Sequence, residues 1–379
     1  MAPTTETLIW PGTEVRIDGA LDIRLVDRGL RPLRLPAWVE PQLPAALELM
    51  ARANAGVRLA LRTQATAIEL TLHATRMDIH GTGPVTASVE VTLDGRRSHR
   101  QALSGGDILH IVAGEEPRFT VGTPQTLRFT QLPAGPKDVE IWLPQSAACD
   151  LVSLTADAPI THPGEVARPR WVHYGSSISH CVEAEGPTGT WPSVAAAAAD
   201  VHSTNLGFAG QAMLDPFVAR VIRDLPADLI TLKIGANLIG QAAMRQRTFV
   251  PAVHGFLDTI REGHPDTPIV VISPIPSPAE DRPGPTVQDP ATGRHHAVGN
   301  PEDIAQGALT ATVVRDLLQQ LTSRRARTDR TLHYLDGRAL FHSDEVADLH
   351  DGLHPNAAAY IRMGTRFAEL LRERDWLAR

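Results

Sequence analysis

Apolar and polar residues alternate over short stretches in the first 165 residues of the chain. Residues 57–73 contain two such stretches, and residues 88–93 contain a third, directly before Asp94-Gly95. A period of two is typical of strands with one buried face, and Asp-Gly is typical of a tight hairpin turn. Further short apolar runs continue the series at residues 108–114, 126–132 and 139–144. The pattern predicts a β-sandwich or jelly roll.

A helical pattern interrupts the predicted sandwich once, at residues 44–56, and ends at a glycine. Residues 161–170 contain two prolines and one glycine and read as a linker. We therefore expect a jelly-roll-like accessory or substrate-shaping domain over residues 1–165, followed by a second domain over residues 166–379.

Strand and helix patterns alternate in the second domain. Strands are predicted at residues 170–175, 227–235, 267–275 and 331–337, and helices at residues 191–201, 248–263, 302–324 and 356–378. Continuous apolar strands of this kind are buried on both faces. The alternation predicts an α/β fold with a doubly wound parallel sheet and helices on both of its faces.

Residues 278–300 form a long segment rich in Pro, Gly and charged residues. Segments of this length are often lids or binding loops, and otherwise are disordered. The His295-His296 pair within it could bind a metal, but no carboxylate or cysteine lies at ligand spacing in the sequence. We expect these two histidines to lie in a solvated loop and to hold no metal.

The first candidate for chemistry is Ser177, which follows a predicted strand in the segment Gly175-Ser176-Ser177-Ile178-Ser179. A serine in a tight strand-to-helix turn can expose its hydroxyl, and backbone N–H groups of the turn can face an oxyanion. Ser179 replaces the second glycine of the G-x-S-x-G elbow, so the α/β-hydrolase fold is not supported. A serine-rich helix N-cap is the alternative, and Ser176 and Ser179 are rival nucleophiles.

Asp351 and His354 form the second candidate, since a spacing of three residues can place both side chains on one side of a turn. The carboxylate would then fix the imidazole tautomer and stabilise the imidazolium. Gly210 and Asn237 lie in two further short segments, residues 205–210 and 234–237, which fall at predicted strand ends or in the loops after them. Glycine allows close backbone approach, and an asparagine amide can donate to an oxyanion. Taken singly, each segment is also consistent with an ordinary turn.

Together, the Ser, Gly, Asn and Asp-x-x-His segments occur in this order at predicted strand ends. Ligands bind there in such sheets. The set resembles the SGNH (GDSL) family of esterases and acyltransferases over roughly residues 169–376. The resemblance implies a flavodoxin-like sheet with Ser177 as nucleophile, His354 as general base and Asp351 as its orienting partner. It also implies an oxyanion hole of the Ser177 and Gly210 N–H groups and the Asn237 side chain.

Two positions depart from the family pattern. Ser176 stands where the family has the Asp that precedes the nucleophile, and Leu238 stands where many members have Asp. His180 follows the nucleophile turn and could line the site, although packing is the simpler expectation.

Composition narrows the function classes. The 379 residues have a net charge of −7, and Lys137 and Lys233 are the only lysines, which argues against nucleic acid as a partner. The sequence contains no apolar stretch of ~20 residues that could cross a membrane. The start of the chain does not resemble a signal peptide, so we expect a cytoplasmic protein with Cys149 and Cys181 as free thiols.

A strand-rich domain before an SGNH domain is similar in layout to jelly-roll carbohydrate esterases. It is also similar to acyltransferases that pass a salicylyl group from coenzyme A to a polyketide hydroxyl. The expected function is acyl transfer through Ser177 from a small-molecule acyl donor to a hydroxyl acceptor. Acyl-CoA would be a co-substrate, and no resident cofactor is expected. The alternatives are an ester hydrolase or carbohydrate deacetylase, and a catalytically inactive glycan-binding module.

Overall fold

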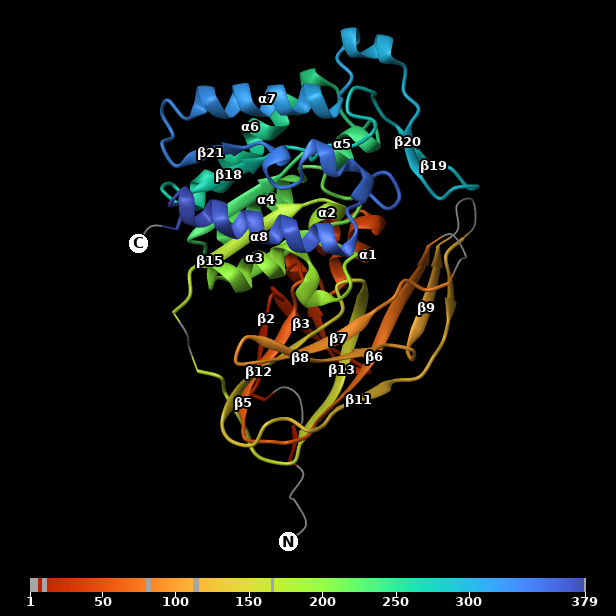
Figure 1. Ribbon diagram of the computed structural model, residues 1–379, viewed down its shortest axis with the longest axis vertical. Helices are drawn as coiled ribbons and strands as arrows, with labels where there is room; N and C mark the ends of the chain where they lie inside the picture. Colours follow the sequence, from red (N-terminus) through yellow and green to blue (C-terminus); the bar gives the residue numbers. More distant parts are fainter. Residues whose placement is uncertain (1–5, 9–11, 80–82, 112–115, 165–166, 378–379) are drawn as a thin grey trace. The chain divides into compact units, whose positions relative to one another are not determined.

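The computed structural model describes residues 6–8, 12–79, 83–111, 116–164 and 167–377 (Figure 1). The chain divides into two compact units. An N-terminal unit comprises Met1–Ala167 and Gly186–Thr188, and a C-terminal unit comprises Arg168–Glu185 and Gly189–Arg379.

The described part of the N-terminal unit is built mainly from two sheets. The first runs in the order β10 (Arg118–Thr120), β9 (Asp107–Ile111), β6 (Ile68–Ile79), β13 (Ala147–Ala156), β4 (Gly29–Leu33) and β3 (Asp22–Val26), with β1 (Glu6–Leu8) paired to β13 and β11 (Gln125–Phe129) paired to β6. The second runs in the order β14 (Ile160–Thr161), β5 (Arg58–Thr63), β12 (Lys137–Trp142), β7 (Ser88–Leu93) and β8 (Arg96–Ala102), with β2 (Arg16–Asp18) beside β5.

One apolar core lies between these sheets, and the alternating residues supply it. Leu59 and Leu61 of β5 and Leu70 and Leu72 of β6 are fully buried in the same cluster. Because successive side chains of a strand point to opposite faces, each strand contributes every second residue. The predicted β-sandwich is therefore confirmed.

The Asp94-Gly95 hairpin is also confirmed. Both residues have positive φ, +49° and +77°, and they join β7 to β8 as the tight turn requires. The helix predicted at residues 44–56 is shorter and covers Ala45–Arg52 as α1. A 3-10 helix, η1 (Ala37–Gln42), precedes it.

The C-terminal unit has a parallel sheet in the order β16 (His202–Gly207), β15 (Arg170–Gly175), β17 (Leu229–Lys233), β18 (Ile269–Ile272) and β21 (Leu332–Leu335). Numbered along the chain, this order is 2-1-3-4-5, which is the flavodoxin-like arrangement. The predicted doubly wound sheet is confirmed.

Helices cover both faces of this sheet (Figure 1). They are α2 (Ser177–His180), α3 (Trp191–Ala199), α4 (Pro216–Asp224), α5 (Ala236–Gly240), α6 (Gln246–Gly263), α7 (Ala311–Arg325) and α8 (Ala357–Glu373). On one face, Trp171 of β15 stacks on Phe367 of α8 and contacts Trp191 of α3. On the other face, Tyr174 of the same strand contacts Phe256 of α6. Trp171 and Tyr174 are three positions apart, so they point to opposite faces and fix helices on both sides of the sheet.

The helix predicted at residues 302–324 is divided in two. A 3-10 helix, η3 (Pro301–Gln306), ends at Gly307 with φ of +91°, and α7 begins after Thr310, whose hydroxyl accepts the Val313 N–H at 3.2 Å. Left-handed backbone cannot continue a helix, so the chain restarts with a new cap. The other 3-10 helices described are η2 (Pro187–Gly189), η4 (Gly337–Ala339) and η5 (Ser343–Asp348).

The segment at residues 278–300 is more ordered than expected, since it contains an antiparallel hairpin of β19 (Thr286–Gln288) and β20 (His295–Ala297). Among the residues described, no helix combines the length and apolar character needed to span a membrane.

Truncating the sandwich core tests this packing. Leu70→Ala is expected to lower the free energy of unfolding by about 2–5 kcal/mol, because Leu70 is fully buried and its loss leaves a cavity. Leu25→Ala on the exposed side of β3 is the matched control and should change it by less than about 0.5 kcal/mol. Urea unfolding followed by circular dichroism measures both. Equal effects would contradict the core placed between the two sheets.

Candidate active site

The residues singled out from the sequence lie at the carboxyl ends of the parallel strands. Ser177 follows β15, Gly210 follows β16, and Asn237 lies on α5 directly after β17. Asp351 and His354 lie between β21 and α8. Because parallel strands end at one edge of the sheet, residues distant in sequence can meet there.

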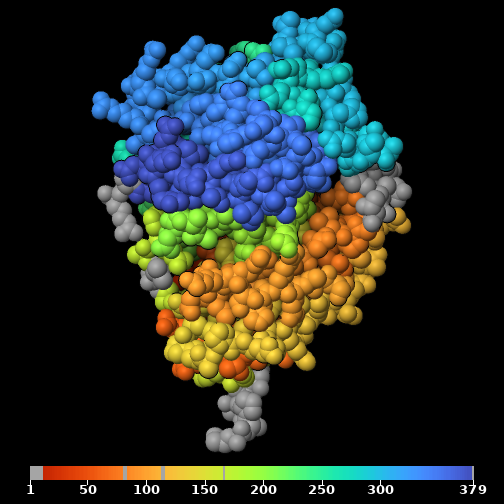
Figure 2. Space-filling model, in the orientation of Figure 1, coloured from red at the N-terminus to blue at the C-terminus, as the bar shows by residue number. Residues whose placement is uncertain are grey.

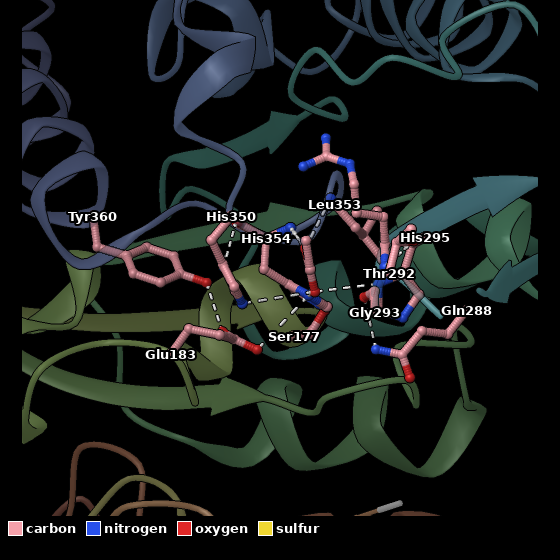
Figure 3. Close-up of polar contacts among 12 residues, drawn as sticks. Ser177, Glu183, Gln288, Thr292, Gly293, His295, His350, Leu353, His354 and Tyr360 are labelled. Carbon is pink, nitrogen blue, oxygen red and sulfur yellow. Dashed lines mark hydrogen bonds and ion pairs between the residues drawn. The ribbon is translucent and has the colours of Figure 1, made fainter. Parts of the chain in front are cut away.

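Ser177, His354 and Asp351 form one chain of hydrogen bonds. Figure 3 shows Ser177 and His354 of this chain. His354 Nδ1 lies 2.7 Å from Asp351 Oδ2, and His354 Nε2 lies 2.9 Å from Ser177 Oγ. An ionised carboxylate can only accept, so Nδ1 carries the proton and Nε2 accepts the serine hydroxyl. This is the arrangement in which an imidazole can remove a proton from a serine.

Local turn geometry fixes the Asp-x-x-His segment. The second carboxylate oxygen, Asp351 Oδ1, accepts the N–H groups of Leu353 and His354 at 2.9 and 2.7 Å. Gly352 has a φ of +83°, a value that favours glycine. Asn356 then caps α8 by accepting the Ala359 N–H at 2.9 Å. The turn and the helix start together hold the imidazole against Ser177.

Charge stabilises the ionised forms of both partners. Burial alone would raise the pKa of Asp351, but the close contact with His295 and the hydrogen bonds from His354 hold it well below its usual range. Burial alone would lower the pKa of His354, but the Glu183 and Asp351 carboxylates outweigh it and raise the pKa. The imidazolium that forms during catalysis is therefore favoured at this position.

Glu183 and Tyr360 contribute to this site, and no pattern in the sequence predicted either of them. Glu183 Oε1 lies 3.8 Å from His354 Nδ1, and Tyr360 donates its hydroxyl to Glu183 Oε2 at 2.9 Å (Figure 3). Burial holds the pKa of Tyr360 well above its ordinary value, so it remains a donor. Neither residue belongs to a recognisable motif, and 177 positions separate them.

The rival serines are enclosed. Ser179 Oγ lies 2.8 Å from His173 Nε2, and His173 Nδ1 lies 2.6 Å from the Thr231 hydroxyl, which also accepts the Trp171 indole N–H. Burial first, and then the charge of Lys233, lowers the pKa of His173 to about 3. Ser176 is 1% exposed and Ser179 is fully buried, whereas Ser177 is half-buried. Ser179 and His173 form a structural polar network beneath the sheet edge.

Two hydrogen bonds join the loop that contains Gly210 to the segment of chain that contains Asn237. Asn237 Oδ1 accepts the Ala212 N–H at 3.0 Å, which leaves the amide NH₂ as the donor end of the side chain. Gly210 has a φ of +69°, and its carbonyl accepts the Gln241 amide at 2.5 Å. Ser177 begins α2, where the first N–H groups have no partner within the helix.

His180 links the nucleophile helix to the Gly210 loop. Its ring is fully buried, and Nδ1 accepts the Ala209 N–H at 3.3 Å. Leu238, at the position where many family members have Asp, is fully buried. His180 therefore helps to position the loop that contains Gly210, and Leu238 packs in the core.

The prediction that His295 lies in a solvated loop is wrong. Its ring is half-buried, and Nδ1 lies 3.2 Å from Asp351 Oδ2, although neighbouring His296 is exposed. No carboxylate lies at ligand spacing from His295 in the sequence, but the fold brings the Asp351 carboxylate next to it. His295, Asp351 and His354 offer three possible metal-ligating atoms within 4.8 Å of one another, and His354 and Asp351 are already hydrogen-bonded to each other.

Comparison with known proteins assigns the family. Residues 173–362 match the model of the GDSL-like lipase/acylhydrolase family. No curated protein matches the chain in sequence.

Solved structures show the same fold. The salicylyl-acyltransferase SsfX3 from a tetracycline biosynthetic pathway has a TM-score of 0.82 and 26% identity, with 100% of both chains covered. A GDSL-like lipase from Bacteroides ovatus has a TM-score of 0.70 and 17% identity over 98% of each chain. A family two carbohydrate esterase from Clostridium thermocellum has a TM-score of 0.62 and 12% identity, covering 96% of this chain and 100% of its own.

These matches cover both the α/β unit with the triad geometry and the β-rich unit before it. The protein is an enzyme of the acyl-transferring or ester-cleaving kind, and it belongs to the GDSL-like lipase/acylhydrolase family.

Proposed function

We propose that the protein is an O-acyltransferase that carries an aryl acyl group, such as salicylyl, on Ser177. The donor would be an acyl-coenzyme A and the acceptor a hydroxyl of a polyketide-type natural product. The observation that carries this proposal is the likeness to the salicylyl-acyltransferase SsfX3, which extends over the whole of both chains. Coenzyme A acts here as a co-substrate, and no resident cofactor or metal is invoked.

The first half-reaction forms the acyl-enzyme. His354 Nε2 takes the Ser177 hydroxyl proton as Oγ bonds to the thioester carbonyl carbon. The tetrahedral intermediate collapses, the carbon–sulfur bond breaks, and the thiol of coenzyme A leaves with the proton from His354. Asp351 stays ionised and stabilises the imidazolium throughout.

The second half-reaction repeats these steps with the acceptor. Its hydroxyl gives a proton to His354 Nε2 as its oxygen bonds to the acyl carbon. The bond to Ser177 Oγ then breaks, and the proton returns to the serine. The Asn237 amide and the Ser177 and Gly210 N–H groups would bind the oxyanion in both halves, and losing one such donor costs ~3–4 kcal/mol of transition-state stabilisation.

Ester hydrolysis is the second candidate. The likeness to a carbohydrate esterase over 96% of this chain favours it, because that enzyme also has both parts of the chain. The same triad serves either reaction, and the outcome depends on whether the site positions an alcohol or admits water.

A fluorophosphonate probe tests the nucleophile. Intact-mass analysis should show one adduct on the wild-type protein, since His354 activates a single half-exposed serine. Ser177→Ala should abolish labelling, whereas Ser176→Ala should retain it because the Ser176 hydroxyl is enclosed. An adduct that persists in Ser177→Ala, or an unlabelled wild-type protein, would refute the acyl-serine assignment.

The reaction type is tested by supplying salicylyl-CoA with and without a polyketide alcohol. A transferase should release coenzyme A slowly by itself and at least about tenfold faster with the correct alcohol, because the positioned hydroxyl outcompetes water. Mass spectrometry of the product identifies the ester. Release that is fast and indifferent to every alcohol offered would favour the esterase alternative.

The pH dependence of kcat/KM reports on His354. Because the base must be neutral and its pKa is raised, activity should fall below a midpoint that lies above the ordinary histidine value of 6.5. Glu183→Gln removes a carboxylate that favours the imidazolium, so the midpoint should move to lower pH. Glu185→Gln, at an exposed position, is the control and should leave it unchanged. If the midpoint pH is the same in Glu183→Gln as in the wild-type protein, the Glu183 carboxylate does not act on His354.

A further inference from the structure

The hairpin of β19 and β20 has a defined shape that fixes where His295 lies. Its strands pair Thr286 with Ala297 and Gln288 with His295. The connecting turn is closed by the Gln288 side chain, which donates to the Gly293 carbonyl at 2.8 Å (Figure 3). His295 is therefore presented from a paired strand rather than from an irregular loop.

The hairpin contacts the triad loop through both the backbone and the side chain of His295. The His295 N–H donates to the Asp351 carbonyl at 2.7 Å. Its Nδ1 lies 3.2 Å from Asp351 Oδ2, in a bent contact, and the imidazole meets the His354 ring edge-on at a centroid distance of 5.7 Å. A carboxylate oxygen has no proton to offer, so the tautomer with a proton on Nδ1 is favoured at this contact.

The chain around the hairpin also packs on the helix that carries Asn237. A Cβ on Gly284 would overlap the Ile239 carbonyl, and a Cβ on Gly240 would lie 3.6 Å from the Thr286 hydroxyl. One segment thus contacts α5 on one side and the Asp351 loop on the other. The position of His295 is set from two directions.

We propose that His295 is a positioning residue for acyl transfer, acting as a second imidazole on the triad carboxylate. The proposal rests on the proposed role of Asp351 and His354. Asp351 Oδ1 accepts two backbone N–H groups, and Oδ2 lies beside His354 Nδ1 and His295 Nδ1. Groups around both oxygens prevent the carboxylate from rotating. His354 is thereby kept aligned with Ser177 without any contact between His295 and the substrate.

Other ionisable groups around this carboxylate do not replace His295. His350 is on the same loop as Asp351, and its Nε2 lies farther away, at 3.9 Å from Oδ2. Arg294 lies beside Gly352, and Glu183 acts on His354 rather than on Asp351. Among these neighbours, His295 alone brings a donor from another part of the chain to within 3.2 Å of Oδ2.

The test compares three variants of the full-length protein. His295→Phe keeps a planar ring without nitrogen, and His295→Asn keeps a donor near the position of Nδ1. His296→Phe makes the same change at the exposed neighbouring position. The measurements are kcat and KM with p-nitrophenyl acetate and the rate of fluorophosphonate labelling, with thermal melting to establish folding.

We expect His295→Phe to lower kcat and the labelling rate about tenfold, the size expected for one lost donor to a charged group, and to leave KM within about twofold. His295→Asn should recover most of the loss, and His296→Phe should behave as wild type. The proposal is overturned if His295→Phe matches His296→Phe, if it raises KM alone, or if His295→Asn is no better than His295→Phe. If His295→Phe does not fold, the comparison of His295→Asn with wild type decides, and a tenfold loss there counts against the proposal.

These outcomes are separate from failure of the proposed function. A wild-type protein that neither reacts with the probe nor turns over the ester would refute the acyl-serine mechanism itself. An active wild-type protein that is indifferent to residue 295 would refute only the role of His295.

Discussion

The contact between His354 Nε2 and Ser177 Oγ is the interaction on which the site depends, and it joins residues that are 177 positions apart. β15 is next to one edge of the sheet, whereas β21 forms the opposite edge, so the loop after β21 must return across the strand ends. Ion pairs tie this loop to the last helix. Glu345 binds Arg366 at 3.0 Å and Arg362 at 2.8 Å, and these contacts outweigh burial and lower the pKa of Glu345 to about 2. The imidazole is positioned by this anchored loop as much as by its own turn.

The nucleophile has a comparable support. The helix that begins at Ser177 has only four residues, too few to be stable by itself. Trp191 donates its indole N–H to the Ile178 carbonyl at 2.8 Å, and Asn205 donates to the Ser179 carbonyl at 2.9 Å. The buried network of Ser179 and His173 completes the support. Ser179, which the sequence presents as a rival nucleophile, therefore helps to hold the reactive serine in place.

The sequence predicted those parts of the structure that follow from local patterns. The period-two strands and the Asp94-Gly95 turn of the N-terminal unit are local features, and so are the strand ends of the parallel sheet. The strand ends made Ser177 and His354 candidates, and the resemblance of all four segments to the SGNH family predicted that the two meet at one edge. β13 was not predicted, because a shift in register between Leu151 and Ser153 breaks the alternation of buried and exposed residues along this strand. The helix predicted over residues 302–324 is divided at Gly307, whose positive φ ends the first part. The bulge in β13 and the break at Gly307 each depend on a single residue, which a periodic pattern over many residues does not reveal.

Neither His295 nor Glu183 could have been found in this way, because their roles exist only in three dimensions. Both residues lie beside the hydrogen-bonded pair of His354 and Asp351. Glu183 lies beside the imidazole of His354, and His295 lies beside the carboxylate of Asp351. Burial disfavours the charged forms of both side chains. Carboxylates near His354 nevertheless raise its pKa, and donors near Asp351 lower its pKa. A proton can then rest on His354 while the oxyanion exists, with no need for solvent to reorganise around it. The physical requirement is a fixed environment for a transient charge, and in this chain it is met by residues outside the recognised motif.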